Sequence, residues 1–318
     1  MRSVKAVLAD IGGTNVRFAT LTADGNIEAV EAWLTALYPD FGSAVCAYAD
    51  AARISFPIPA AGICAAGPLI DGRIELTNCI WKIARGDIAL PTGASSVVLV
   101  NDFEAVARAV PGLGGGDLIQ IGGGEPLADA PKVALGPGTG LGVASAVFDG
   151  AGHWLVAAGE GGHADLAPTN ARELAIVYQL MREFGHVSVE RVLSGPGLET
   201  LYLAIAALDG VNLNQRPIAH DIAQAAKALR DPVAVEAVSL FTAWLGSVAG
   251  NVALTLGARG GVYIAGGIVA QWGDLFDAKL FRHRFEAKGR MRHFLAPIPC
   301  YLVTAKDLAF RGLAAMID

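Results

Sequence analysis

An acidic residue and a glycine pair stand between two apolar segments near the start of the sequence. In VLADIGGTNVRFATLTADGN, residues 7–26, Asp10 is followed by Gly12, Gly13 and Thr14. Glycine lets backbone N–H groups approach phosphate oxygens closely, and a threonine hydroxyl adds a hydrogen-bond donor. An acid beside phosphates would be repulsive unless a cation intervened, and Mg²⁺ suits one carboxylate plus phosphate oxygens. We therefore predict a phosphate-binding turn, with Asp10 as a direct or water-mediated ligand of a nucleotide-bound Mg²⁺.

The same pattern recurs 125 residues later without a gap. The stretch KVALGPGTGLGVASAVFDG, residues 132–150, places Thr139 opposite Thr14, whereas Leu135 stands where the first copy has Asp10. Each copy predicts a strand, a Gly-Thr turn, a strand, an Asp-Gly turn and a strand. A repeat of this kind indicates a duplicated domain, whose two turns would face each other across a cleft and hold a nucleotide's phosphates from both sides. Either turn alone could be an ordinary hairpin.

Two stretches further along hold acidic residues that could do chemistry. Asn101 and Asp102 end the apolar run VVLV and open a helix, whose positive end would keep Asp102 ionised as an acceptor for a hydroxyl proton. The alternative is that the pair only caps the helix. Glu160 and His163 lie in the glycine-containing loop GEGGHADLAP, where a carboxylate accepts hydrogen bonds and an imidazole can both donate and accept them. Such side chains in a loop are usually just solvated. Glu190, at the start of the stretch ERVLSGPGLETLY, is a further candidate, although it could be a surface acid that pairs with Arg191.

Composition sets limits on the protein class. The 318 residues are 53% hydrophobic and 17% charged, with a net charge of −6, so we expect a large core divided into two lobes. No basic arm or polybasic cluster stands out, which argues against nucleic-acid binding. The four cysteines are scattered without zinc-site spacing and are expected to be buried, reduced thiols. The start MRSVKAVLADIGG lacks a secretory signal pattern, so we expect a cytoplasmic protein.

Alternating strand and helix patterns predict an α/β fold. The glycine-rich residues 112–125 predict a lobe boundary or exposed loop. Residues 238–258 are uncharged over a bilayer-spanning length, but their Thr, Ser, Asn and Gly content favours a buried helix and no membrane contact. Strands are predicted at 4–10, 15–22, 27–33, 61–66 and 260–268, and residues 95–103 are predicted as a buried strand that runs into a helix. Further helices are predicted at about 171–184, 197–208, 221–230 and 235–257.

Six motifs in order give the sequence a family resemblance over nearly its whole length. They are ADIGGTNVRFA (9–19), NDFEA (101–105), GPGTGLGVA (136–144), GEGGHADLAP (159–168), ERVLSGPGLETLY (190–202) and GGVYIAGGI (260–268). This set resembles the bacterial glucokinases of the hexokinase/actin/Hsp70 superfamily. The cysteine cluster of the zinc-containing sugar kinases is missing, and no DNA-binding segment precedes the first strand, which favours the zinc-free branch. In the segment 76–83 the family often has a histidine where this chain has Cys79, so that segment is left out of the predicted site.

The resemblance implies a fold and a set of site residues. The fold would be two-lobed and ribonuclease H-like (actin-like ATPase), with duplicated domains around a central cleft: a small lobe of 1–110 plus 302–318, and a large lobe of 111–301. Asp102 would be the catalytic base for the 6-hydroxyl, and the sugar ligands would be Asn101, Asp102, Glu160, His163 and Glu190. The ATP-binding residues would be Ala9, Asp10, Ile11, Gly12, Gly13, Thr14, Gly138, Thr139, Gly140, Gly266 and Gly267, with Asp10 serving the metal.

The implied activity is transfer of the γ-phosphoryl group of MgATP to the 6-hydroxyl of D-glucose, with no covalent intermediate. A kinase for another hexose, such as fructose or mannose, and a non-catalytic nucleotide or sugar sensor are the alternatives. Retention of Asp10, Asp102 and both turns argues against the sensor. On general grounds we expect a homodimer.

Overall fold

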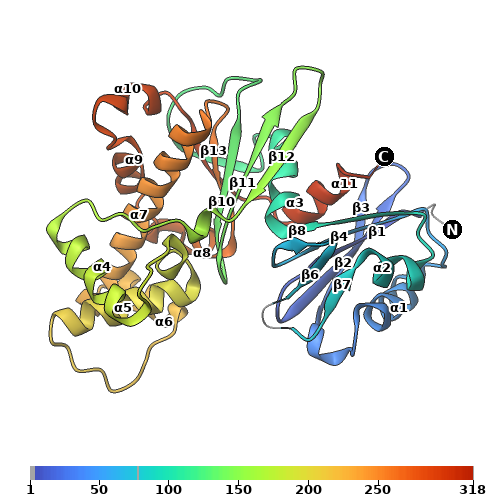
Figure 1. The fold of residues 1–318 in the computed structure, drawn as a ribbon, viewed down its shortest axis with the longest axis horizontal. Helices are drawn as coiled ribbons and strands as arrows, with labels where there is room; N and C mark the ends of the chain where they lie inside the picture. Colours follow the sequence, from blue (N-terminus) through green and yellow to red (C-terminus); the bar gives the residue numbers. More distant parts are fainter. Residues whose placement is uncertain (1–3, 77–78, 318) are drawn as a thin grey trace. The chain divides into compact units, whose positions relative to one another are not determined.

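The chain is seen here in a computed structural model that describes residues 4–76 and 79–317; residues 77 and 78, in the segment 76–83 set aside above, lie outside them (Figure 1). By its internal contacts it divides into two compact units. Unit 1 comprises residues 1–113, 154–158 and 305–318, and unit 2 comprises 114–153 and 159–304. The fold is α/β, as the sequence predicts.

Unit 1 is built on a five-stranded sheet of order β3-β2-β1-β4-β8. Strand β1 is antiparallel to β2 and parallel to β4, which is parallel to β8. The strands are β1 (Val4–Ile11), β2 (Asn15–Thr22), β3 (Ile27–Leu34), β4 (Ala60–Ala65) and β8 (Ser96–Asn101). A smaller antiparallel sheet holds β5 (Leu69–Ile70), β6 (Arg73–Glu75) and β7 (Lys82–Ala84).

Alternation along β1 divides the core of unit 1 into two layers. Val7, Ala9 and Ile11 face helices α1 and α2, whereas Ala6 and Leu8 face α3 and α11 (Figure 1). Gly312 of α11 lies so close to the Ala105 carbonyl of α3 that a Cβ atom would overlap it, so glycine allows these two helices to cross. The helices are α1 (Phe41–Ala52), α2 (Arg85–Thr92), α3 (Asp102–Ala109) and α11 (Leu308–Ala314), with 3₁₀ turns η1 (Thr35–Leu37) and η2 (Val110–Gly112).

Unit 2 repeats this sheet plan. The second sheet has the order β12-β11-β10-β13-β14-β9, and its strands belong to unit 2 except β12, whose residues 154–158 group with unit 1. Strand β10 is antiparallel to β11 and parallel to β13, which is parallel to β14. One extra strand, β9, pairs antiparallel with β14 and occupies part of the glycine-rich segment 112–125 that the sequence predicted as a boundary or loop. The strands are β9 (Leu118–Gly122), β10 (Lys132–Pro137), β11 (Leu141–Phe148), β12 (Trp154–Gly159), β13 (Val262–Ile264) and β14 (Cys300–Val303).

The apolar helix predicted from residues 238–258 is α7, and it lies in the core of unit 2. It spans Pro232–Leu256, with the Asp231 carboxylate capping its first turn and Gly257, in the left-handed conformation, following its last residue. It is long and apolar enough to cross a membrane, but 78% of its most apolar window is buried inside the protein. Gly246 and Gly250 let α7 approach the backbone of α9 at Phe281 and Phe285, where a Cβ atom would not fit.

The remaining helices of unit 2 surround α7 or lie beside it. Helix α4 matches its predicted span, whereas the strand predicted at 260–268 stops at Ile264 because α8 begins at Gly267. The helices are α4 (Ala171–Phe184), α5 (Gly195–Leu208), α6 (Ala219–Lys227), α7 (Pro232–Leu256), α8 (Gly267–Trp272), α9 (Ala278–Glu286) and α10 (Arg292–Leu295), with turns η3 (Gly161–His163), η4 (Val189–Arg191), η5 (Gly273–Leu275) and η6 (Gly289–Met291).

The four cysteines are all free thiols, but they are not all buried as predicted. Cys64 and Cys300 are buried, Cys79 is partly buried, and Cys46 is exposed on α1. Cys46 is exposed because it lies on the outer side of the amphipathic helix α1. The prediction was wrong because it considered the residue type and not the position on the helix.

Candidate active site

The carboxyl ends of three parallel strands form one part of the site, in unit 1. The register aligns Ile11 of β1 with Ala65 of β4, and Ala65 with Asn101 of β8, so the strands end together. One position earlier, Asp10 stands beside Cys64. Ligand and catalytic groups in open parallel sheets gather at this edge because the strands end there and the chain turns into loops or helices.

Asp10 lies at this edge with several polar neighbours. Its cross-strand partner is Arg17, whose Nη1 atom is 3.7 Å from Asp10 Oδ2, and the Cys64 thiol donates to Asp10 Oδ1 at 3.6 Å. Burial raises the pKa of Asp10 above its usual range, and the Arg17 guanidinium and the Cys64 thiol offset part of that rise. The side chain remains 24% exposed, so a ligand can reach it.

Arg17 is a neighbour that sequence reasoning did not single out. Its Nη2 atom donates to Asp307 Oδ1 at 2.5 Å, and the guanidinium lies over the Phe310 ring, 4.9 Å from its centroid. Residues opposite each other in a hairpin follow from the turn length, so the pairing of Arg17 with Asp10 could have been found from the sequence.

Asn101 and Asp102 lie at the start of α3. The Asn101 side chain accepts the Phe103 N–H at 2.8 Å and donates to the Gly67 carbonyl at 2.8 Å, so Asn101 is the helix cap. Asp102 is the first helical residue, and its Oδ1 atom also accepts the Phe103 N–H, at 2.9 Å. Burial first, and then the charges of Asp10 and Asp102, raise the pKa of the Cys64 thiol well above its usual range. Both predicted acids therefore lie around one buried thiol.

The turn after β1 leaves backbone donors available. Gly12 N–H bonds the Asn15 carbonyl at 2.8 Å, and the Thr14 carbonyl accepts from both the N–H and the hydroxyl of Thr35 at 3.0 Å. Within the described part of the chain, the N–H groups of Gly13 and Thr14 have no acceptor. Two adjacent unpaired donors at a glycine turn are typical of an anion-binding nest.

The second turn, in unit 2, is tighter. Gly138 N–H bonds the Gly140 carbonyl at 2.8 Å, and the Gly138 carbonyl accepts from Gly195 N–H at 2.8 Å. The N–H groups of Thr139 and Gly140 have no acceptor among residues 4–76 and 79–317. The turn thus presents two donors, like its counterpart in unit 1.

The three predicted sugar ligands of unit 2 gather around the first residue of β11. Glu190 Oε2 accepts the Leu141 N–H at 2.7 Å, which removes that donor from any phosphate. Gly162 of η3 lies against the Leu141 carbonyl, where a Cβ atom would overlap it. On either side of this glycine, His163 Nε2 and Glu160 Oε2 are 3.8 Å apart, and both side chains are more than half exposed.

Gly266 and Gly267 lie where β13 passes into α8. Gly266 has a φ of 95° and lies against the Pro137 carbonyl, so only glycine fits there. Beside α8 is a cavity of about 190 Å³ between α5, α6 and α8, whose wall holds apolar and amide groups together with His220 and Lys227. They include Leu198, Gln224, Ile268 and Gln271, which sequence reasoning did not find because they belong to three separate helices.

Comparisons with known proteins decide the family. A sequence model of the glucokinase family matches residues 7–318. A glucokinase of Chromobacterium violaceum is 45% identical over 312 residues, covering 97% of this chain and 88% of that protein. The chain belongs to the glucokinase family.

Two further similarities describe how this family member compares in structure and length. The crystal structure of a glucokinase from an Antarctic psychrotroph superposes with a TM-score of 0.86 at 32% identity, covering 98% of both chains. The bifunctional protein glk of Burkholderia pseudomallei is 42% identical over 98% of this chain, but this chain spans only 48% of that protein's length. The match therefore extends over the whole glucokinase fold and over about half of the bifunctional relative.

Proposed function

We propose that the protein transfers the γ-phosphoryl group of ATP to the 6-hydroxyl of D-glucose, giving glucose 6-phosphate and ADP. Membership of the glucokinase family carries the proposal. The placement of Asp10 and Asp102 at one sheet edge of unit 1 supports it, because a metal-binding carboxylate and a base for a hydroxyl are what this chemistry requires.

We infer that the architecture is the duplicated, two-lobed, actin-like ATPase fold. In unit 1, β1 pairs antiparallel with the following strand β2 and parallel with β4, and in unit 2, β10 pairs antiparallel with the following strand β11 and parallel with β13, which supports a duplication. The proposed small lobe, 1–110 plus 302–318, is close to unit 1, and the proposed large lobe, 111–301, is close to unit 2. Residues 154–158 group with unit 1 and would be an exception to that division.

We propose that both glycine turns bind phosphate. The unpaired N–H groups of Gly13, Thr14, Thr139 and Gly140 would donate to phosphate oxygens, and the two threonine hydroxyls would add donors. The nucleotide base would enter the cavity beside α8, where Gly266 and Gly267 keep the backbone clear and the amides of Gln224 and Gln271 offer both donors and acceptors. Ala9 and Ile11 would serve only to position Asp10 and the turn, since their side chains are fully buried.

The donor set around Asp10 fits Mg²⁺. Residues 4–76 and 79–317 contain no group of three His, Cys, Asp or Glu side chains that could hold a metal ion. A metal ion bound there would therefore need ligands from the substrate or water. Mg²⁺ accepts a single carboxylate together with phosphate oxygens and water. Asp10 would hold the ion, which when bound neutralises charge on the phosphate oxygens.

Asp102 is the proposed base. Its position at the first turn of α3 puts the helix dipole and the Phe103 N–H on its carboxylate, which favours the ionised form that accepts the proton of the 6-hydroxyl. Asn101 is fixed by its hydrogen bonds to Gly67 and Phe103, so its amide would meet a sugar hydroxyl in one orientation. Glu160, His163 and Glu190 would bind the other hydroxyls and discriminate between sugars by leaving a polar group unpaired when the wrong one binds.

The decisive experiment is a coupled assay of ADP formation with glucose and MgATP. Mannose and fructose in place of glucose test the sugar, and ADP in place of ATP tests the donor. We expect kcat/KM for glucose to exceed that for the other hexoses. Equal or higher kcat/KM for another hexose would assign a different substrate, and glucose binding in calorimetry without turnover would indicate a sensor. We further propose a cytoplasmic homodimer, which sedimentation velocity would test.

A further inference from the structure

A basic segment lies in unit 2 outside every residue assigned to the reaction. Residues 277–293, DAKLFRHRFEAKGRMRH, hold six Lys or Arg residues against two acids, in a protein whose net charge is −6. This corrects the expectation that no polybasic cluster exists. The cluster escapes a composition count because its charges are spaced by apolar residues that face inward, such as Phe281 and Phe285.

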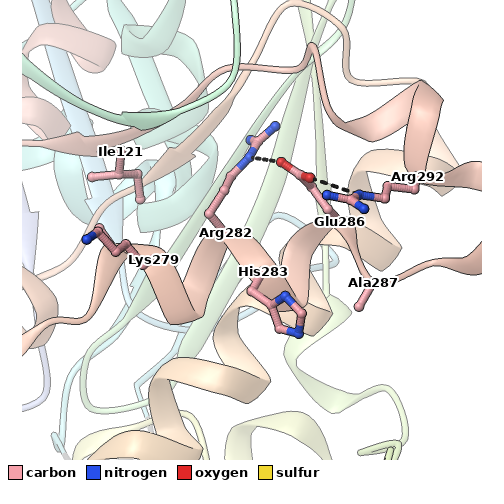
Figure 2. Close-up of a pocket in the computed structure, with 8 residues that line it drawn as sticks. Ile121, Lys279, Arg282, His283, Glu286, Ala287 and Arg292 are labelled. Carbon is pink, nitrogen blue, oxygen red and sulfur yellow. Dashed lines mark hydrogen bonds and ion pairs between the residues drawn. The ribbon is translucent and has the colours of Figure 1, made fainter.

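The segment lines a groove of about 560 Å³ (Figure 2). Lys279, Arg282, His283 and Glu286 stand three or four residues apart on one face of α9, so they share the groove wall. Arg292, at the start of α10, and Ile121 of β9 add to the wall. On the opposite side of α9, Phe281 and Phe285 pack against α7 and Arg284 pairs with the buried Glu173, so the groove-lining face is fixed in position.

One arginine in the wall is committed to structure. Arg282 is 12% exposed and donates to Glu286 and to the carbonyls of Leu295, Ala296 and Ile298. Gly122 makes room for it, because a Cβ atom there would lie 2.6 Å from Arg282 Cδ. Arg282 therefore shapes the floor of the groove and has little capacity for a ligand.

Two further cations of the segment are engaged outside the groove, Arg284 with Glu173 and Lys288 with the Ser247 hydroxyl, whereas Lys279 and Arg292 in the groove wall carry surplus charge. Glu286, the acid in the groove wall, is bound by Arg282 at 2.6 Å and by Arg292 Nε at 3.4 Å, and Figure 2 shows the three side chains in a row. Within residues 4–76 and 79–317, the Lys279 ammonium and the His283 ring have no hydrogen-bond or ion-pair partner. The Arg292 side chain is 74% exposed, with only Nε engaged.

We propose that this groove binds a phosphorylated small molecule, with Lys279 and Arg292 as its principal contacts to a phosphate monoester. A concave site with surplus positive charge concentrates anions, and guanidinium and ammonium groups together suit a phosphate dianion. The volume lies in the range of small-molecule sites, which favours a metabolite over a bare ion. None of the proposed catalytic or ATP-binding residues lines the groove, so the site is separate from the proposed reaction.

The test uses glycerol 2-phosphate, which has a phosphate monoester but no hexose ring or nucleotide base. Its binding to the full chain is followed by isothermal titration calorimetry and by ³¹P line broadening at low ionic strength, with glycerol as the neutral control. We expect saturable binding that weakens about fivefold or more in 0.5 M NaCl, because exposed charges are screened at that salt concentration.

Paired variants locate the binding. Lys279→Ala combined with Arg292→Ala should weaken binding about tenfold, and Lys279→Glu should weaken it at least as much. Arg182→Ala is the matched control, since Arg182 is an exposed arginine on α4 outside the groove, and it should leave affinity unchanged. Circular dichroism and glucose phosphorylation confirm folding, because Lys279 and Arg292 are exposed and lie outside the proposed catalytic site.

Three outcomes would overturn the proposal. They are absence of saturable binding, equal weakening by Arg182→Ala, and binding of a long polyanion such as heparin without competition by glycerol 2-phosphate. If the chain does not phosphorylate glucose, this test stays intact, since binding of glycerol 2-phosphate is measured without turnover and circular dichroism alone then confirms folding.

Discussion

The two Gly-Thr turns come from one sequence repeat but have different structures. The turn after β1 places four residues between the paired Ile11 and Val16, whereas the turn after β10 places three between Pro137 and Leu141. Pro137 has no N–H, so the bond that Gly12 donates in the first turn cannot form at the equivalent position, and Gly138 donates instead. The two copies align without a gap in sequence, but the second turn is one residue shorter than the first.

The acidic residues differ as well. The first turn follows Asp10, at whose place the second copy has the fully buried Leu135, and the second turn lies against Glu190, which comes from η4. Both turns present backbone donors, but in unit 1 the acids nearby are Asp10 at the sheet edge and Asp102 at the start of α3, whereas in unit 2 they are Glu190 of η4 and Glu160, which precedes η3. In the function proposed above, unit 1 would thus supply the base and the metal ligand, and unit 2 would add sugar ligands.

The largest effect is expected at Asp102. Asp102→Asn keeps the side-chain shape and an oxygen for the Phe103 N–H but removes the proposed base. We expect kcat to fall by roughly 10³-fold or more, with the KM for glucose changed little. Steady-state kinetics with glucose and MgATP measure both constants. A decrease in kcat smaller than about tenfold would mean that Asp102 is not the base.

A smaller loss is expected at Asp10, and it tests what distinguishes the first turn from the second. Asp10→Asn should lower kcat by about 10²-fold, because the proposed Mg²⁺ loses its carboxylate ligand. Mn²⁺ binding in the presence of ATP, followed by electron paramagnetic resonance, should weaken in parallel. Unchanged Mn²⁺ affinity with lost activity would contradict the metal assignment and leave a purely structural role.

Two substitutions in unit 2 separate sugar binding from support of the second turn. Glu160→Gln should raise the KM for glucose about 10- to 30-fold and leave the KM for ATP nearly constant. The reason is that, of the two substrates, only glucose would donate hydrogen bonds to the Glu160 carboxylate, and a neutral amide accepts them more weakly. Glu190→Gln should raise both KM values, because Glu190 also holds the Leu141 N–H beside the turn. The same pattern from both variants would remove the distinction between them.

Elements with strong local signals could be predicted from the sequence. Helix α4 was predicted correctly, because Asn170 caps it, Gly185 ends it, and the buried residues Ile176, Val177 and Leu180 recur on one face. The strand predicted at 260–268 was too long, because the glycine pair that resembles an apolar strand end is where α8 starts. Strand β9 was missed because it forms only by pairing with β14, nearly 180 residues away in the chain.

The site was predictable to a similar extent. Motifs placed Asp10, Asp102 and both turns, and the β1–β4–β8 register brings the two acids of unit 1 to one edge. Neither Arg17 with its partner Asp307, nor the cavity beside α8, follows from a motif. Both depend on the packing of helices that are distant in sequence.

The smallest effect concerns the pH dependence of stability, which should have opposite signs for one acid in each unit. Burial raises the pKa of Asp10, so the folded state binds its proton more tightly than the unfolded chain does. The stability that this group contributes is therefore lost as pH rises from about 3.8 through the raised pKa. Burial alone would also raise the pKa of Glu173, but hydrogen bonds from Arg284 and Thr169 outweigh it and lower that pKa. The stability from Glu173 is present above about pH 4.5 and is lost as pH falls through the lowered pKa.

Differential scanning calorimetry of two isosteric variants between pH 4 and pH 7 tests this contrast. The Tm of Asp10→Asn minus the Tm of the parent should rise by about 2–4 °C from pH 4 to pH 7. The parent loses stability as the buried Asp10 ionises, whereas the asparagine does not titrate. Glu173→Gln should show the reverse, with a Tm deficit that grows toward pH 7, because the Arg284 guanidinium then keeps its charge without its partner at 2.5 Å. Parallel pH profiles for the two variants would contradict the opposite electrostatic surroundings of these acids in the two units.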